Sequence, residues 1–276
     1  MKKEVISAKE AAALVKDNMT ISLTGFIGFS IPEDILCKLE QRFLTEHSPK
    51  DLTLFYAAGI AGDGKKRGVN HLGHKGLLKK LYCANNSLGL NMSNQIANNS
   101  FPAFMAPQGV LLRLYRAIAA GEPGVITHVG LKTFVDPRVE GGAVNEKAKK
   151  SGEKVSELIK LRGKEYLFHP SFPIDLVFIK GTTADEDGNI TINREAMKLE
   201  QFELAAAAKN SGGIVVAQVD NVVLSGSLNA KDVVVPGKLI DYLVLGDPDN
   251  SRQHYTDYEE GRYIPSWSGE LKVTLP

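Results

Sequence analysis

Residues 19–33, MTISLTGFIGFSIPE, decide the fold of this chain. The apolar and β-favouring residues from Met19 to Thr24 predict a buried strand, and two glycines, at positions 25 and 28, predict a tight loop directly after it. Ser30-Ile31-Pro32-Glu33 has the spacing of a capping box with proline in the first turn, so a helix is expected to begin near Pro32. A second strand is expected over Leu52 to Ala57. This order of strand, glycine loop, helix and strand is typical of a parallel sheet.

The same alternation continues along the rest of the chain. A capping box at Ser7 and Glu10 predicts a first short helix, and an amphipathic helix is expected from Gln108 to Gly121. Further predictions are strands over Leu176–Lys180, Ile214–Val219 and Tyr242–Leu245, a hairpin turn at Asp185–Gly188 and a helix over Glu195–Lys209. Strands that alternate with helices predict an α/β fold with a mainly parallel sheet flanked by helices.

Composition excludes several classes of protein. Of the 276 residues, 33 are Lys or Arg and 32 are Asp or Glu, and the net charge of +1 argues against a nucleic-acid partner. Charges interrupt the first ten residues, and no run approaches the roughly 20 apolar residues of a membrane span, so a cytoplasmic protein with no membrane partner is expected. Cys37 and Cys83 are interpreted as reduced core thiols, because two cysteines cannot form a disulfide framework and neither has a base nearby in the sequence.

The loop made of Gly25, Phe26, Ile27, Gly28 and Phe29 is the first candidate site. It joins a strand to the start of a helix, where backbone N–H groups and the helix dipole favour a phosphate or carboxylate oxygen. The loop has only G-x-x-G in place of the dinucleotide fingerprint G-x-G-x-x-G, so a Rossmann cofactor is not indicated. A tight turn without a ligand explains the same glycines equally well.

Two other motifs partly resemble phosphate- or metal-binding sequences. Gly59 to Lys66 approaches the phosphate loop G-x-x-x-x-G-K-[ST], but Lys66 replaces the hydroxyl residue that would hold magnesium. A solvated basic turn is the simpler interpretation, and a nucleotide hydrolase is a distant alternative. His71 and His74 lie close together in a Gly-rich stretch with no carboxylate beside them in the sequence, so no metal site is predicted.

Pro107, Gln108 and Gly109 form the second candidate site. Pro107 ends an extended segment, and Gln108 stands in the first turn of the following helix, so its side-chain amide is a hydrogen-bond donor near a positive helix end. Gly109 allows another group to approach the backbone closely. The corner could therefore stabilise an oxyanion during acyl transfer, although helix capping by Gln108 is the simpler alternative for these residues alone.

With these residues the chain resembles a known family. Residues 17–32, which contain the first glycine loop, are similar to the N-terminal pattern of the family I CoA-transferases, and Pro107-Gln108-Gly109 recurs in register. The other matching segments are Gly130 with residues 133–138 (TFVDPR), residues 163–167 (GKEYL), residues 235–237 (VPG) and residues 268–270 (SGE). The resemblance is to the first half of single-chain propionate or acetate CoA-transferases, and it implies a CoA-transferase α-subunit-like fold over residues 1–249.

The resemblance implies a ping-pong exchange of CoA between an acyl-CoA and a short-chain carboxylate such as acetate or propionate. A family glutamate attacks the thioester and later carries CoA, and the residue matching Gln108 donates to the oxyanion. Coenzyme A is then a substrate, and neither a permanent cofactor nor a metal is required. The Ser-Glu-Asn-Gly segment that supplies the glutamate is absent from the sequence. A β-type half, in a separate subunit or in a further C-terminal part, is therefore the expected partner, within a higher oligomer.

Three departures from the family pattern affect this expectation. Thr24 and Ser30 stand where the family favours glycine, and residues 84–86 (ANN) replace a Gly-His-Trp element of the acyl pocket. Residues 250–276 gather the only Trp and three of the eight Tyr, and they are interpreted as a connector or docking arm toward the β-type half, or as an arm on their own domain. The alternative function is a non-catalytic CoA or carboxylate-binding or sensing module with the same fold.

Overall fold

The computed structural model describes residues 2–61, 66–248 and 250. Eight strands form the central sheet in the order β1-β14-β12-β9-β2-β3-β4-β5, and every neighbouring pair in it is parallel. The strands are β1 (Glu4–Ile6), β2 (Thr20–Leu23), β3 (Leu52–Tyr56), β4 (Leu78–Cys83), β5 (Ala103–Met105), β9 (Leu176–Lys180), β12 (Ile214–Val219) and β14 (Tyr242–Leu245). The expected α/β fold with a parallel sheet is confirmed.

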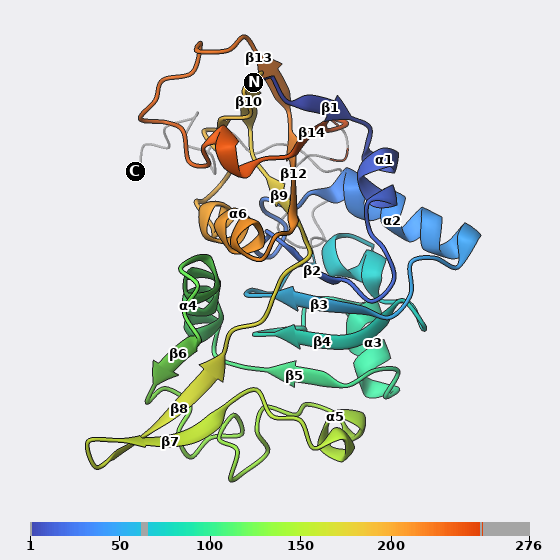
Figure 1. The fold of residues 1–276 in the computed structure, drawn as a ribbon. Helices are drawn as coiled ribbons and strands as arrows, with labels where there is room; N and C mark the ends of the chain where they lie inside the picture. The colour runs from blue at the N-terminus through green and yellow to red at the C-terminus, as the bar shows by residue number, and fades with distance from the viewer. Residues whose placement is uncertain (1, 62–65, 249, 251–276) are drawn as a thin grey trace, which may run out of the picture.

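Helices cover both faces of this sheet, each over its own apolar core (Figure 1). One face carries α1 (Ala8–Ala13), α2 (Glu33–Glu46), α3 (Leu90–Ala97) and the 3₁₀ helix η1 (Gly68–Leu72). The other carries α4 (Gln108–Ala119) and α6 (Gln201–Asn210), which pack against each other. The carboxyl ends of the parallel strands share one edge, and both candidate sites directly follow strands at that edge.

Two small sheets extend the central layer. β6 (Gly124–Thr127), β8 (Lys164–Pro170) and β7 (Glu157–Leu161) form an antiparallel sheet at the foot of Figure 1, near the short helix α5 (Glu146–Ser151). β11 (Ile190–Thr191), β10 (Thr183–Asp185) and β13 (Asn221–Val223) form the other, followed in the chain by the 3₁₀ helix η2 (Gly237–Leu239). The predicted hairpin turn at 185–188 is confirmed, because it joins the antiparallel strands β10 and β11.

Local signals placed most elements correctly. The strands β9, β12 and β14 have the predicted bounds, and the capping box of Ser7 and Glu10 is formed. The capping box predicted at Ser30 and Glu33 is wrong. Pro32 is the N-cap and gives no side-chain hydrogen bond, while the side chains of Ser30 and Glu33 bind other elements.

The helix expected from Glu195 is also shorter than predicted, because α6 begins only at Gln201. The Glu195 carboxylate turns into the interior and pairs with Lys180, which holds the preceding segment out of the helix. The predicted domain boundary at residue 249 and the arm after it lie outside the described residues, apart from Asn250. Within the described ranges, the longest helix has 14 residues, and none combines the length and apolar character that crossing a bilayer requires.

Candidate active site

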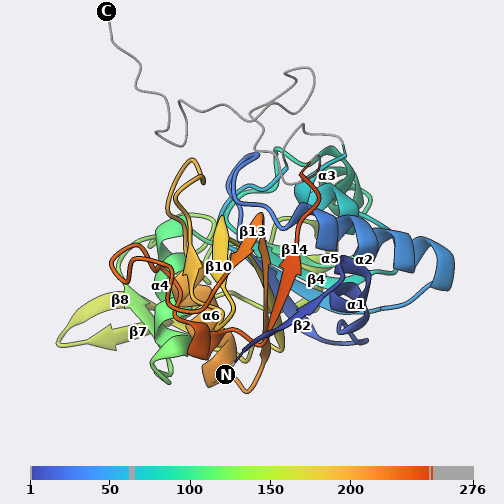
Figure 2. The same ribbon diagram turned by 90° about the horizontal axis from the view of Figure 1, so that it is seen from above.

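The first glycine loop, residues 25–29, closes tightly on itself and on the neighbouring loop. Phe26 N–H donates to Phe29 O (3.1 Å) and Phe29 N–H donates to Phe26 O (2.9 Å). Ile27 N–H donates to Gly59 O (2.6 Å), and Ala61 N–H donates to Ile27 O (2.9 Å). The loop after β2 is thereby tied to the loop after β3, at the carboxyl edge of the sheet (Figure 2).

These hydrogen bonds reduce the number of backbone N–H groups that the loop could offer to the predicted anion. The N–H groups of Phe26, Ile27 and Phe29 are occupied within the chain, so they are not available to a ligand oxygen. The N–H of Gly28 has no acceptor among the described residues. The loop therefore offers a small number of donors in a rigid frame, in contrast to the ring of free amides that phosphate loops use.

Several residues of the loop have unusual backbone conformations, which only the contacts around the loop can maintain. Gly25 has φ +150°, and a Cβ on it would stand 2.7 Å from Ile60 Cγ2. Ile27 and Ser30 have φ values of +55° and +51°, which lie in the left-handed region that residues other than glycine rarely adopt. Such residues cost of order 1–3 kcal/mol each and persist only where surrounding contacts hold them.

The second glycine-rich segment supports this loop. Gly59, Ile60 and Ala61 follow β3 and contact the first loop as described above, whereas Gly62 to Lys65 of the phosphate-loop-like motif lie outside the described residues. The chain continues into the five-residue 3₁₀ helix η1, not into the α-helix that follows a phosphate loop. The described residues thus give the motif a packing role against residues 25–29.

Gln108 opens helix α4 at the same edge of the sheet. Pro107 is its N-cap, and the preceding Ala106 N–H donates to Cys83 O at the end of β4 (3.2 Å). Both Gln108 and Gly109 are exposed, and no atom lies within 4 Å of a Cβ built on Gly109. Within the described part of the chain, the Gln108 side chain makes no hydrogen bond, so the capping alternative is wrong and its amide is free to donate.

A buried polar contact fixes α4 to the sheet. Tyr115, two helical turns after Gln108, is fully buried, and its hydroxyl lies 3.0 Å from Ser22 Oγ on β2. Ser22 in turn donates to Phe55 O on β3 (2.5 Å), and the Phe55 and Tyr115 rings stand 4.8 Å apart. A polar side chain in a core is tolerated only when its hydrogen bonds are made, so this contact sets the position of α4 closely.

The structure does not bring the two candidate sites into contact within this chain. β2 and β5 are separated by β3 and β4, which at about 4.8 Å per strand spacing sets them roughly 14 Å apart. In the described ranges, no hydrogen bond joins residues 25–29 to residues 107–109.

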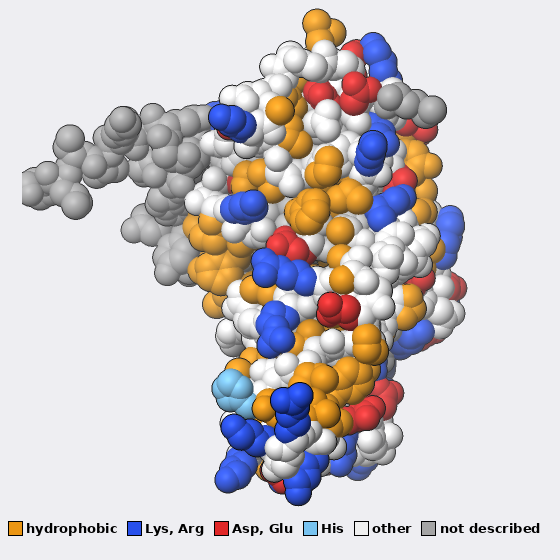
Figure 3. Space-filling model, turned by 60° about the vertical axis from the view of Figure 1, so that its left-hand side comes forward, with side chains coloured by type: hydrophobic (Ala, Val, Ile, Leu, Met, Phe, Trp, Pro, Cys, Tyr) orange, Lys and Arg blue, Asp and Glu red, His pale blue; other side chains and the backbone are white. Residues whose placement is uncertain are grey.

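The side of the molecule that carries α4 and β6 has exposed apolar side chains between Lys and Arg residues (Figure 3). Two of the exposed apolar residues in this part of the chain are Ile126 and Val129.

The histidine pair has carboxylate partners that the sequence did not reveal. His71 Nδ1 and His74 Nε2 lie 2.6 and 2.5 Å from the two oxygens of Glu40, and His71 Nε2 lies 3.0 Å from Glu33 Oε1. Cys37 Sγ is 3.5 Å from His71 Nε2, and its side chain is partly exposed, so the expectation of a core thiol is wrong for Cys37. The carboxylates come from α2, about 30 to 40 residues earlier in the chain, which is why local sequence did not show them.

This cluster can be read as hydrogen-bonded or as metal-binding. Glu33, Cys37 and His71 place one ligand atom each within 4.8 Å of one another, a spacing that a cation could use. However, Glu33 already accepts from Gly68 N–H (3.0 Å) and faces Arg67 Nε (3.5 Å). A divalent metal ion would place two further positive charges beside that guanidinium, whereas a protonated His71 adds one and shares it between two carboxylates, so a protonated His71 accounts for these contacts.

The pKa values follow from this arrangement. Burial alone would lower the pKa of His71, but its contacts with Cys37, Glu33 and Glu40 raise it to about 12. Burial alone would raise the pKa of Glu40, but hydrogen bonds from His71 and His74 lower it to about 2. Cys83 behaves as predicted, because burial raises the pKa of its thiol to about 12 and keeps it protonated.

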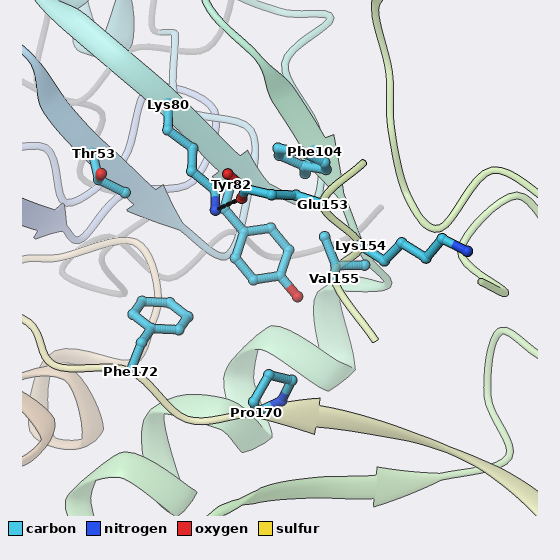
Figure 4. Close-up of a pocket in the computed structure, with 9 residues that line it drawn as sticks. All are labelled: Thr53, Lys80, Tyr82, Phe104, Glu153, Lys154, Val155, Pro170 and Phe172. Atoms are coloured by element: carbon cyan, nitrogen blue, oxygen red, sulfur yellow. Dashed lines mark hydrogen bonds and ion pairs between the residues drawn. The ribbon is translucent and has the colours of Figure 1, made fainter. Parts of the chain in front are cut away.

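A pocket of about 130 Å³ lies elsewhere, against β3, β4 and β5 (Figure 4). Tyr82, Phe104 and Phe172 form its apolar walls, and Lys80 pairs with Glu153 across it. None of the residues 25–29 or 107–109 lines this cavity. It is therefore separate from the site that the sequence predicted.

The chain is similar to known proteins over almost its whole length. The family model "Coenzyme A transferase" matches residues 5–246, so the chain belongs to the coenzyme A transferase family. The chain is 40% identical over 270 residues to the caffeate CoA-transferase of Acetobacterium woodii and 35% identical over 276 residues to the acetate CoA-transferase YdiF of Escherichia coli K12. The matches cover 98% and 99% of this chain but 50% and 51% of the two relatives, so the chain spans about half the length of the curated relatives it matches.

Two further matches show which part of the related enzymes this chain corresponds to. The acetoacetyl-CoA:acetate/butyrate CoA transferase alpha subunit of Clostridium acetobutylicum is 28% identical over 246 residues, which are 88% of this chain and 98% of that subunit. The crystal structure of the YdiF acyl-CoA transferase apoenzyme from Escherichia coli O157:H7 has a TM-score of 0.91 at 34% identity, covering 100% of this chain and 52% of that one. The expected resemblance to the α-type half of a family I CoA-transferase is confirmed.

Proposed function

We propose that this chain is the α-type half of a CoA-transferase that moves CoA between an acyl-CoA and a short-chain carboxylate. One observation carries the proposal: the chain matches an α subunit over 98% of that subunit's length but only half of single-chain relatives. A β-type half then supplies the other wall of the site. The exposed Gln108 and the open space at Gly109 fit a surface that another polypeptide covers.

The proposed chemistry is a double displacement. A carboxylate oxygen of a glutamate on the β-type half attacks the thioester carbon, and the C–S bond breaks to give an acyl-glutamyl anhydride and CoA thiolate. The thiolate then attacks the glutamyl carbonyl, which releases the first carboxylate product and leaves a glutamyl-CoA thioester. An acceptor carboxylate reverses these steps.

Each addition passes through a tetrahedral oxyanion, and the free side-chain amide of Gln108 is the donor we assign to it. Helix α4 contributes its positive end directly behind this amide. The loop of residues 25–29 is assigned to the wall of the cleft, where Gly28 N–H is the donor it can offer. CoA enters as a substrate, and this scheme needs no bound cofactor or metal.

An aromatic acid is the second candidate for the acyl group. The relative with 40% identity is named a caffeate CoA-transferase, whereas the short-chain assignment rests on the relative with 35% identity, named an acetate CoA-transferase. The segment 84–86, which departs from the family pattern, follows β4 and reaches the loop at Gly59, where Asn85 Cγ is 3.6 Å from a Cβ position on that glycine. Asn85 and Asn86 are smaller than the His and Trp that the family pattern has in this segment.

Reconstitution tests the proposal. The chain is co-expressed with a β-type half carrying the Ser-Glu-Asn-Gly segment, and transfer of CoA to acetate, propionate and caffeate is measured for the complex and for each half alone. We expect activity only in the complex and a glutamyl-CoA adduct on the β-type half by intact mass. Transfer by the purified chain alone would overturn the division of the site, and a complex that binds acyl-CoA without turnover would favour the sensing module.

A further inference from the structure

Thr24 and Ser30, at the two ends of the first glycine loop, are joined by a hydrogen bond, and Thr24 also binds the neighbouring strand. Thr24 Oγ1 accepts from Lys180 N–H on β9 (3.0 Å) and donates to Ser30 O (3.0 Å). Both side chains are buried, with exposed fractions of 0% and 1%. These are the two positions at which the family pattern favours glycine. The hydroxyls therefore add contacts that a glycine at either position lacks.

Ser30 continues this chain of contacts into a buried ion cluster. Its hydroxyl donates to Glu195 Oε2 (2.8 Å), and Glu195 Oε1 accepts from Lys180 Nζ (2.9 Å). Lys180 Nζ also donates to Asp220 Oδ1 (2.9 Å) and to Gly181 O (2.5 Å), so all three of its protons have acceptors. Lys180 is 1% exposed and Glu195 is 6% exposed.

A buried ion cluster of this kind contributes positioning more than stability. The cost of removing both charges from water offsets much of their attraction, so the net gain is small, but every member has one allowed geometry. Glu195 lies in the irregular segment before α6, 15 residues from Lys180 and 165 residues from Ser30. The cluster thus joins four separate segments, those of Ser30, Lys180, Glu195 and Asp220, at the carboxyl edge of the sheet.

We propose that Glu195 and Lys180 are positioning residues that hold the loop of residues 25–29 in its binding conformation through the hydroxyl of Ser30. This inference rests on the proposed function, because the loop is the assigned wall of the CoA cleft. Ser30 has φ +51° and ends the loop, and its side-chain bond to Glu195, together with the bond from Thr24 to its carbonyl, holds it in this unfavourable backbone region. Loss of that bond lets the loop relax and displaces Gly28.

A double-mutant cycle tests the inference in the complex with the β-type half. Ser30→Ala removes the hydrogen bond to Glu195, and Glu195→Gln removes the charge that strengthens it; each should raise the KM for acyl-CoA about tenfold with kcat changed less than threefold. Because we assign the effect of Glu195 on the loop to this bond, Glu195→Gln should change the KM little further in a Ser30→Ala background, even though it also weakens the pair with Lys180. Multiplying effects, or an unchanged KM in both, would overturn the proposal. The matched control is Ser227→Ala, an exposed serine whose hydroxyl donates to Leu224 O within its own turn.

Hydrogen exchange of the isolated chain gives a readout that needs no activity. Amides of residues 24–32 should exchange about tenfold faster in Ser30→Ala and in Glu195→Gln, whereas peptides from α2 and β3 keep the wild-type rate. Equal rates in the loop would overturn the inference whatever the enzyme does. Absence of CoA transfer by the wild-type complex would instead count against the proposed function. If Glu195→Gln does not fold, Ser30→Ala alone decides the exchange result.

Discussion

The two parts of the candidate site differ in how far this chain completes them. Residues 25–30 are held by hydrogen bonds to the rest of the chain, with Gly59, Ala61, Thr24 and Glu195 as the partners. Residues 107–109 are exposed, with no side-chain bond at Gln108 among the described residues and nothing near Gly109. Under the proposed function, this chain completes the loop by itself, whereas Gln108 lies on a surface that the β-type half covers.

This difference separates two kinds of residue. A braced loop should respond to mutation through stability and substrate binding, because its contacts are already made in the isolated chain. An exposed donor should leave stability unchanged and affect only the chemical step, because its partner exists only when the oxyanion forms. The predictions below test that separation, beginning with the largest effect.

Replacing Gln108 by Ala should lower kcat of the reconstituted complex by roughly 10²–10³, the scale for loss of one oxyanion donor. The unfolding temperature of the isolated chain should not change, because the side chain makes no hydrogen bond in the described structure. Steady-state kinetics and thermal unfolding measure the two. The control is Arg113→Ala on the same helix, also exposed, which should keep wild-type turnover. Full activity of Gln108→Ala would remove this residue from the mechanism.

The positions of both candidate segments in the fold could be predicted from sequence, because the signals there are local. Gln108 after a proline, and the glycines after a buried strand, point to their positions because strand, loop and helix signals adjoin. The partners of these segments could not be predicted. Glu195 looked like a helix residue and Glu33 like a capping residue, since nothing in the sequence shows that Lys180 and His71 lie opposite them. Buried polar pairs join segments far apart in the chain, and local propensity says nothing about them.

Replacing His71 by Gln should reduce the unfolding free energy by about 3 kcal/mol near pH 5.5, since Glu33 and Glu40 lose their shared cation beneath α2. The pKa of His71 is raised from 6.5 to about 12 by Cys37, Glu33 and Glu40 against the effect of burial, so its contribution is complete below pH 6.5 and declines as pH rises toward 12.

The acid side of the same cluster has the opposite sign. The pKa of Glu40 is lowered from 4.5 to about 2, so its contribution is complete above pH 4.5 and lost as pH falls toward 2. The difference between the wild type and His71→Gln is then largest between pH 4.5 and 6.5. Denaturant unfolding at several pH values measures it, with the exposed His128→Gln as control. A difference that stays constant from pH 5 to 9 would show that folding does not raise the pKa of His71.

Replacing Gly25 by Ala should destabilise the chain by about 2 kcal/mol, because the new Cβ would stand 2.7 Å from Ile60 Cγ2 at φ +150°. Chemical denaturation measures the loss. In an Ile60→Ala background the same change should be less costly, because the methyl groups that it meets are gone. Equal costs in the two backgrounds would mean that the braced loop yields elsewhere.

Replacing Gly109 by Ala provides the matched change in the open region and the smallest effect on the chain. Nothing lies within 4 Å of the new Cβ, and alanine favours the helical conformation that α4 already has, so the unfolding free energy should rise by about 0.5–1 kcal/mol. In the complex the methyl group would occupy space that we assign to the partner, so KM should increase although the chain is more stable. If KM and stability both keep or improve on their wild-type values, the partner does not approach α4 at this residue, and the open region is solvent rather than an interface.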